Sequence, residues 1–537
     1  MQNKDVQPIF ILPENTMRST GRSAQRNNIA AAKLVAETVR TTLGPKGMDK
    51  MLVDSMGDVI ITNDGATILR EMQIEHPAAK MLVEVAKTQE EVVGDGTTTA
   101  AVLAGELLKQ AEILLEKNIH PTIIAKGYRI AQEKTQTILK NISEPVNERN
   151  LNLLKEIALT AMTGKGAEVA KEKLSLICLK ALLKVMRKTD GGILVDREDI
   201  AIEKKIGGSI DESEIIEGII LDKEKVHPGM PKSVSNSIIA LIDCPLEIKN
   251  TEIEAKIQIT DPSQLQSFID TEERILKGMV DKLVSLGVNS VFCQKGIDDL
   301  AQHYLAKNGI YSCRRIKKSD MERLAKVTGA KIITKLSDLR NIDLGSAELV
   351  EERKIGEEYM TYIYSSNSKA VTILVKGGTD HIAAEVKRAV EDAVGDLIAA
   401  VKFGRVVAGA GACEIEVARN LRLFATSLSG REQLAVLAFA DAMEIIPITL
   451  AENAGLDPID VLTDLKVAHD KGVKWAGIDV FTGRIIDAWE EGIIEPLKIK
   501  TQAVGSASEV AEMILRIDDV IASGQQPNQQ MNMPDTD

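Results

Sequence analysis

The amino-acid sequence predicts a multidomain protein of the α and α/β classes, and three observations carry that prediction. A chain of 537 residues is too long for one hydrophobic core and implies about three domains. Residues 77–93 and 100–117 have the apolar spacing of long helices, and so do many segments of both terminal thirds. Between residues 218 and 369, short apolar runs instead alternate with helices, which is typical of a compact α/β domain inserted in the chain.

The N-terminal third begins with elements of several kinds. Residues 6–12 form a short apolar stretch between two prolines, consistent with an edge strand that needs a partner. Helical spacing from residue 22 to 43 stops at Gly44-Pro45, and residues 51–62 alternate as a hairpin. The hairpin leads into a new helix through Asp64, whose side chain is either a helix N-cap or a functional carboxylate.

The loop Gly94-Asp95-Gly96-Thr97-Thr98-Thr99 lies between the two long helical patterns. Its glycines permit positive φ, so that backbone N–H groups can face one point, to which the next helix adds its unpaired N-terminal donors. Such a point suits a phosphate, and Asp95 is then explained by a Mg²⁺ ion between its carboxylate and the phosphate oxygens. The alternative is ordinary turn and N-cap chemistry at a helix start.

The middle of the chain contains further candidates. Lys165, in Thr163-Gly164-Lys165-Gly166, is either a phosphate partner or a solvated turn residue. The segment from 250 to 281 is unusually long for a connection between strands, and is either a functional excursion or a helix packed on its own sheet. Residues 359–364 and 370–375 are predicted to be paired strands.

A predicted helix from 379 to 401 contains Asp392, which in a helix interior is most often simply exposed. After it, residues 405–414 are predicted as strand, turn and helix. They resemble a dinucleotide-binding fingerprint that is incomplete, because Glu414 replaces the third glycine. Two strands, 477–480 and 484–487, follow near the end of the chain, and the polar tail 524–537 is expected to be disordered.

Composition excludes several classes of function. Aromatic residues make up 3% of the chain, so the core must be aliphatic and stacking platforms for nucleic acid are lacking. The net charge of −13 also argues against nucleic acid as a partner. Five scattered cysteines indicate neither a disulfide framework nor a zinc site. We expect a cytoplasmic protein without a membrane span.

Taken together, the loops at 42–47, 63–67, 94–99, 163–166 and 409–411 resemble those of the chaperonin family, most closely its group II branch, the archaeal thermosome and the eukaryotic cytosolic chaperonin. The likeness runs through almost the whole chain. It implies a mainly helical equatorial domain, a small intermediate domain and an α/β apical domain with a helical protrusion. The residues implied for these parts are equatorial 1–147 and 404–523, intermediate 148–217 and 370–403, and apical 218–369 with a built-in lid near 250–281.

The resemblance also implies ATP and Mg²⁺ as cofactors and a role for each matching residue. Asp95 would hold Mg²⁺, Asp479 would lie beside the base and Glu495 would bind the ribose. Asp64 and Asp392 would orient the attacking water. The remaining residues implied for nucleotide binding are Thr42, Leu43, Gly44, Pro45, Gly96, Thr97, Thr98, Thr99, Thr163, Lys165, Gly409 and Gly411.

The implied partners are non-native polypeptides and identical or homologous subunits in two stacked rings, and the implied activity is protein folding driven by ATP hydrolysis. The hairpin at 51–62 would pair with terminal strands of a neighbour. Two alternatives stay open at this point. A small-molecule kinase could use the same phosphate loops, and a ring scaffold could have lost hydrolysis, although retention of both Asp64 and Asp392 speaks against the scaffold.

Overall fold

The computed structural model describes residues 16–189, 192–248, 262–355, 358–365 and 370–523. The strand predicted at 6–12, the tail 524–537 and the first part of the 250–281 connection lie outside these residues. The chain divides into two compact units, unit 1 from residues 1–144 and 405–537 and unit 2 from residues 145–404. Both are described separately below. The predicted multidomain α and α/β class is confirmed, while the finer division into three nested domains stays a prediction.

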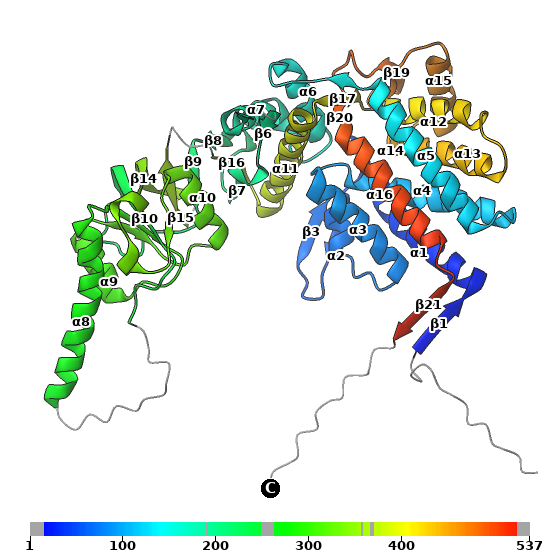
Figure 1. Ribbon diagram of the computed structural model, residues 1–537. Coiled ribbons are helices and arrows are strands. Elements are labelled where there is room, and N and C mark those ends of the chain that lie inside the picture. Colours follow the sequence, from blue (N-terminus) through cyan, green and yellow to red (C-terminus); the bar gives the residue numbers. More distant parts are fainter. Residues whose placement is uncertain (1–15, 190–191, 249–261, 356–357, 366–369, 524–537) are drawn as a thin grey trace, which may run out of the picture. The chain divides into compact units, whose positions relative to one another are not determined.

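Unit 1 is mainly helical and is built from both ends of the chain (Figure 1). Its helices are α1 (Gly21–Arg40), α2 (Gly65–Glu71), α3 (Pro77–Val92), α4 (Thr97–Glu116), α5 (Pro121–Ile142), α12 (Ala412–Ala425), α13 (Arg431–Met443), α14 (Ile445–Asn453), α15 (Pro458–Asp470) and α16 (Leu497–Leu515). Its strands are β1 (Thr16–Thr20), β2 (Lys50–Val53), β3 (Val59–Thr62), β17 (Arg405–Ala408), β18 (Ala476–Asp479), β19 (Arg484–Asp487), β20 (Ile494–Pro496) and β21 (Asp519–Ser523).

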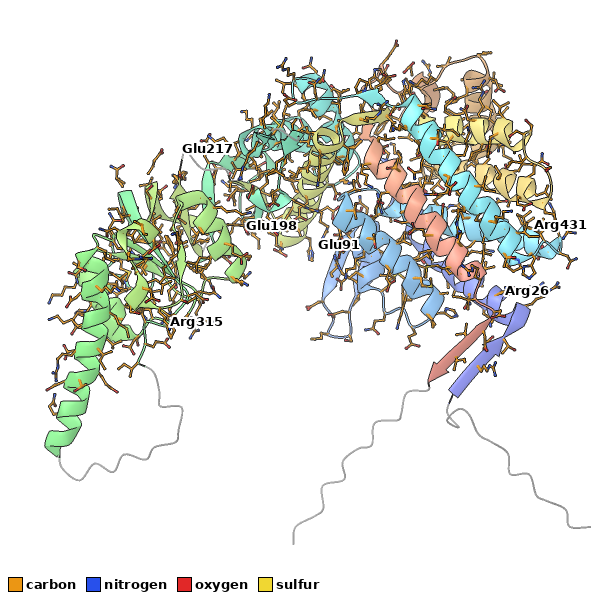
Figure 2. All side chains as sticks on the ribbon, in the orientation of Figure 1. Arg26, Glu91, Glu198, Glu217, Arg315 and Arg431 are labelled. Atoms are coloured by element: carbon orange, nitrogen blue, oxygen red, sulfur yellow. The ribbon has the colours of Figure 1, made fainter. Side chains whose placement is uncertain are left out.

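Helix α4 lies at the centre of this unit, where it contacts α1, α3, α13 and α16. The core is aliphatic, as predicted, and small residues let the helices approach closely. A Cβ atom on Gly105 of α4 would lie only 2.2 Å from the Cβ of Ala36 in α1. Two of its few aromatic side chains, Tyr128 and Phe439, meet edge to face with ring centroids 5.7 Å apart. Figure 2 shows side chains filling the spaces between these helices.

The strands of unit 1 pair in short pieces. β1 pairs antiparallel with β21, so the two ends of the described chain lie side by side (Figure 1). β2 and β3 form the predicted hairpin, with Met51 opposite Ile61. β17 pairs with β20, and β18 with β19, both antiparallel. These last two pairs bring residues near 409, 479 and 495 into one region of the unit.

One stretch of unit 1, Arg431–Asn453, is long and apolar enough to cross a membrane by composition alone. In the structure, 78% of its apolar window is buried, and the stretch divides into α13 and α14. Arg431, labelled in Figure 2, is exposed at its start. The burial is that of a helix pair in a protein core, which makes the stretch weak evidence for a membrane span.

Unit 2 contains two sheets with helices around them. The smaller sheet has the strand order β7-β16-β8, and the larger runs β12-β11-β10-β14-β15-β9 with β13 on β10. The strands are β7 (Ile200–Ile206), β8 (Glu214–Ile216), β9 (Gly218–Leu221), β10 (Ser233–Ile242), β11 (Ser290–Cys293), β12 (Tyr311–Cys313), β13 (Ile332–Ile333), β14 (Gly345–Ile355), β15 (Glu358–Tyr364) and β16 (Val371–Gly377), besides a short hairpin of β5 (Arg187–Thr189) and β6 (Gly192–Leu194) and the two-residue β4 (Glu144–Pro145) at the unit boundary. The helices are α6 (Leu151–Met162), α7 (Lys171–Val185), α8 (Pro262–Ser285), α9 (Asp299–Lys307), α10 (Lys318–Thr328) and α11 (Asp380–Phe403).

The predicted pairing of the strands near 359–364 and 370–375 is wrong. Both strands exist, as β15 and β16, but β15 pairs with β14 and β9, whereas β16 pairs with β7 and β8. The two lie in different sheets. Short-range pattern favours a hairpin wherever two strands follow closely, whereas the long-range pairing of β16 with β7 buries β16 almost entirely.

Helix α8 accounts for the described part of the long 250–281 connection and continues to Ser285. Its C-terminal half packs through Leu276, Val280 and Leu283, which are fully buried. Residues 270–275 are exposed on every side, and α8 extends beyond the large sheet (Figure 1). The part of α8 after residue 275 therefore fits the interpretation of an ordinary helix packed on its own sheet, whereas residues 270–275 do not.

Candidate functional site

Asp64 is the N-cap of α2, at the turn that follows β3. Its two carboxylate oxygens accept hydrogen bonds from the backbone N–H groups of Ala66 at 3.3 Å and Thr67 at 2.8 Å. The Thr97 hydroxyl also donates to Asp64, at 3.1 Å. Asp64 thus caps a helix, and it touches the first residue of α4 as well, so the N-cap interpretation does not exhaust its role.

Gln89, a fully buried residue of α3, fixes the loop before α4 through hydrogen bonds. The Gln89 amide donates to the backbone carbonyls of Asp95 at 2.9 Å and Ile499 at 3.3 Å. Gly96 is the N-cap of α4 with a φ of 79°, and a Cβ there would lie 2.6 Å from the Ile499 side chain. The loop is therefore pressed against the start of α16, and glycine is required at position 96.

Thr98 of the same loop packs against the start of α2. A Cβ atom on Gly65 would lie 2.5 Å from the Thr98 hydroxyl and 3.0 Å from its backbone nitrogen. The N-terminal ends of α2 and α4 therefore meet at van der Waals distance. Because the first N–H groups of each helix have no partner within that helix, this region is rich in hydrogen-bond donors.

The loop after α1 contains the predicted residues Thr42, Leu43, Gly44 and Pro45. The Thr42 hydroxyl donates to the Val39 carbonyl at 2.8 Å, and the Asn453 amide of α14 donates to the Leu43 carbonyl at 2.9 Å. Gly44 has a φ of 82°. The loop is thereby fixed to α14.

The predicted strand, turn and helix around Gly409 are confirmed by β17 and α12. Gly411 is the N-cap of α12, with a φ of 79°. A Cβ on Gly409 would lie 2.5 Å from a carboxylate oxygen of Glu495. Ala410 has a φ of 55°, which is unfavourable for a residue with a Cβ, and its carbonyl accepts from the Ile478 N–H at 3.0 Å. That bond places the neighbouring Asp479 beside the glycine turn.

Asp479 itself closes a tight turn between β18 and β19. Its carboxylate accepts from the Thr482 hydroxyl at 2.5 Å and from the Phe481 N–H at 2.9 Å. The hydrogen bond from Thr482 holds the pKa of Asp479 below its ordinary value. The side chain is thus ionised and fixed.

Glu495 belongs to a buried chain of charges that the sequence did not reveal. Lys500 of α16 lies between Glu495, at 2.8 Å, and Glu414 of α12, at 3.0 Å. Burial raises the pKa of Glu495, against the opposing charge of Lys500, and the negative charge of Asp95 adds to the rise. Burial disfavours the charged form of Lys500, but the two glutamates outweigh it and raise the pKa of the lysine.

In unit 2, Lys165 and Asp392 meet. The Lys165 ammonium lies 2.5 Å from the Asp392 carboxylate, and the two side chains are 22% and 18% exposed. Lys165 is therefore not merely a solvated turn residue, nor is Asp392 simply exposed. The Thr163 hydroxyl donates to the Leu159 carbonyl at 2.7 Å, at the C-terminal end of α6.

The structure thus places the predicted residues in two sets. Unit 1 holds residues 42–45, 64, 95–99, 409, 411, 479 and 495, and unit 2 holds Thr163, Lys165 and Asp392. Gln89, Glu414 and Lys500 are additions to the first set. No cluster of three or more metal-binding side chains occurs among the described residues. Asp95 alone suits an ion that takes a single protein carboxylate together with phosphate oxygens and water, as Mg²⁺ does.

Comparisons with known proteins agree over nearly the whole chain. The model of the TCP-1/cpn60 chaperonin family matches residues 35–525. Thermosome subunit beta of Archaeoglobus fulgidus is 62% identical over 518 residues, which cover 96% of this chain and 95% of that protein. A thermosome subunit of Methanopyrus kandleri is 60% identical over 520 residues, covering 97% and 95%. The solved open-state monomer of a group II chaperonin from Methanococcoides burtonii is 47% identical with a TM-score of 0.60, and the match covers 79% of this chain and all of that one.

Proposed function

The chain belongs to the TCP-1/cpn60 chaperonin family as a group II chaperonin, and on this premise we propose that it is a ring subunit that hydrolyses ATP to enclose and fold non-native polypeptides. The observation that carries the hydrolytic part is the contact between Asp64 and Thr97. It joins a carboxylate able to orient water to a helix N-terminus able to hold phosphate.

ATP would be bound by unit 1. The backbone N–H groups of residues 96–99 would hold the β- and γ-phosphates, and the loop of Thr42, Leu43, Gly44 and Pro45 would lie against the phosphates. Gly409 and Gly411 would let the backbone approach the nucleotide, with Glu495 at the ribose and Asp479 at the base. The close packing at Gly65, Gly96 and Gly409, where a Cβ would meet neighbouring atoms within about 2.6 Å, supports a site shaped by backbone.

Mg²⁺ would be held by Asp95, where it would neutralise phosphate charge. Asp64 and Asp392 would position the attacking water in line with the γ-phosphate. These aspartates belong to different compact units, so hydrolysis would depend on one residue from each unit. Lys165, already paired with Asp392, would respond to the γ-phosphate from unit 2, together with Thr163.

The subunits would assemble, identical or homologous, into two stacked rings. The β2–β3 hairpin supports this, because Met51, Val53 and Met56 are 65%, 63% and 88% exposed. Such a hairpin would pair with the β1–β21 ends of a neighbour. The exposed residues 270–275 of α8 would form part of a lid that closes over the captured polypeptide. We place the assembly in the cytoplasm.

The fate of the phosphoryl group distinguishes the proposed ATPase from the alternative, a small-molecule kinase. ATP turnover should release inorganic phosphate and respond to added unfolded protein. A kinase would instead transfer phosphate to an acceptor and would turn over slowly without it. Phosphorylation of a metabolite at a rate matching ATP consumption would overturn the proposal.

A further inference from the structure

We propose that Lys500 is a positioning residue for nucleotide recognition, which holds the Glu495 carboxylate in the orientation that accepts hydrogen bonds from the ribose hydroxyls. The inference rests on the proposed function, in which Glu495 is the ribose ligand. It goes further by assigning the specificity for the sugar to a buried ion pair behind that ligand.

The position of Lys500 is unfavourable in free energy for a cation that has no partner. It is the fourth residue of α16, where the positive end of the helix dipole disfavours a cation. Its side chain is only 9% exposed, so the ammonium has lost most of its hydration. Carboxylates at 2.8 and 3.0 Å, those of Glu495 and Glu414, offset both effects.

The two carboxylates are not equivalent. Glu414 is 3% exposed, and one of its oxygens has no hydrogen-bond partner among the described residues, so Lys500 is its main support. Glu495 is 22% exposed, which leaves part of its carboxylate accessible. Glu414 is therefore suited to balance the buried charge of Lys500. Glu495 is suited to contact a nucleotide while it is paired with the lysine.

Glu495 is also confined on its other side. One oxygen is 2.8 Å from the Lys500 ammonium. The other oxygen is 2.5 Å from the point that a Cβ atom on Gly409 would occupy. The ammonium at one oxygen and the glycine turn beside the other restrict the rotation of this carboxylate. Its remaining lone pairs can accept hydrogen bonds from a ligand.

The same turn of α16 is tied to the proposed phosphate loop. Gln89 donates to the carbonyls of both Asp95 and Ile499, the residue before Lys500. Thr99 and Lys500 line one small cavity together with Glu414. The position of the ribose ligand is thus linked through α16 to the loop that would hold the phosphates.

The test compares the affinities of full-length protein for ATP and for 2′,3′-dideoxy-ATP, which lacks both ribose hydroxyls. We expect the unaltered protein to prefer ATP by roughly tenfold or more, because hydrogen bonds to a charged group are lost with the analogue. In Lys500→Met that preference should fall to within about twofold of unity while the affinity for the dideoxy analogue stays the same. A fully retained preference would overturn the inference.

Lys498→Met is the matched control. It is the same substitution in the same turn of α16, but the Lys498 ammonium donates to the Gln502 side chain at 3.0 Å, so its loss should leave the ribose preference unchanged. If Lys498→Met lost the preference as fully as Lys500→Met, the effect would not come from the pair of Lys500 with Glu495, and the inference would be overturned. Should Lys500→Met not fold, Lys500→Met/Glu414→Gln carries the test, since it leaves no unpaired buried carboxylate at position 414.

The outcomes separate this inference from the function on which it rests. If the unaltered protein and Glu495→Gln both bound ATP and the dideoxy analogue equally, the ribose role of Glu495 would be wrong. If Glu495→Gln lost the preference and Lys500→Met kept it, only the role of Lys500 would be wrong. A second readout is pH: without Lys500, burial should raise the pKa of Glu495 further, so the small ribose preference of Lys500→Met should increase as pH rises and Glu495 ionises.

Discussion

The Lys165 ammonium lies 2.5 Å from the Asp392 carboxylate, and the pair joins the turn after α6 to the interior of α11. If Asp392 orients the attacking water, Asp392→Ala should slow ATP hydrolysis by roughly 100-fold or more, because an acid–base or water-positioning group contributes on that scale. ATP affinity should change by less than about threefold, as Asp392 would act on the water rather than on the nucleotide.

Glu391→Gln provides the control for this substitution. Glu391 is the adjacent acid of α11, 35% exposed and 3.8 Å from Lys387. The Glu391→Gln substitution should leave both ATP binding and ATP hydrolysis unchanged. Equal losses of binding and hydrolysis in Asp392→Ala would remove the proposed role.

Asp95 should control the Mg²⁺ dependence of binding. Asp95→Ala removes the carboxylate that would hold the ion, so the affinity for Mg-ATP should fall by roughly tenfold or more. In excess EDTA the same variant should bind ATP as well as the unaltered protein or better, because one negative charge near the phosphates is gone. Titration calorimetry with and without Mg²⁺ measures both, and unchanged Mg-ATP affinity would contradict the metal assignment.

The contact between the turn at Ala410 and Gly477 of strand β18 should be detectable, because a substitution at one position should suppress the effect of a substitution at the other. A Cβ on Gly477 would lie 2.9 Å from the Ala410 Cβ and 3.1 Å from its carbonyl oxygen. Gly477→Ala should therefore destabilise unit 1 by about 1–3 kcal/mol. Ala410→Gly should recover part of the loss, since it removes the nearest atom and relieves the positive φ of Ala410.

Chemical denaturation of the single and double variants measures this coupling. Gly505→Ala is the control, because its Cβ would meet no atom closer than 3.9 Å and an alanine favours the helix. Strictly additive effects of the substitutions at 477 and 410 would show that side chains at these two positions do not contact each other.

Stability should depend on pH through Glu416 and the buried His469. The ring nitrogens of His469 lie 2.8 Å from the Glu416 carboxylate and 2.9 Å from the Ala476 carbonyl. Burial acts to raise the pKa of Glu416, but the hydrogen bonds from His469 and Asn420 outweigh it, so the pKa is lowered from 4.5. A lowered pKa stabilises the fold above the unfolded-state value, and this contribution is lost as pH falls through the folded-state value.

Glu416→Gln should thus lower the free energy of unfolding by about 1–3 kcal/mol at pH 7. The difference in this free energy from the unaltered protein should shrink as pH is lowered below 4.5. The fluorescence of Trp475 and Trp489, whose rings stack 5.9 Å apart next to this contact, reports the transition. The exposed Glu84→Gln should show no such pH-dependent difference. If the difference in free energy of unfolding between Glu416→Gln and the unaltered protein stayed constant down to pH 3, the stabilising role of the Glu416 carboxylate would be contradicted.

Sequence reasoning succeeded where the signal is local. The residues after β3 predicted that Asp64 begins a helix, and the turn residues of 405–414 predicted β17 and α12. It failed where distant segments meet. Glu414, Glu495 and Lys500 converge only because β17 pairs with β20, and no spacing in the chain signals that contact. Gln89 likewise has no sequence signal that distinguishes it from the other polar residues of its helix, although it is fully buried and bonded to the Asp95 carbonyl.

The measurement that tests the central claim most directly is ATP-driven enclosure of an unfolded protein. The purified particle is loaded with a denatured, labelled polypeptide, exposed to protease with and without Mg-ATP, and assayed for the label and for phosphate release. We expect a particle many times the mass of one chain, in which Mg-ATP protects the label from digestion and hydrolysis accompanies its folding. Hydrolysis by single chains or dimers that never protect the polypeptide would contradict the proposed function.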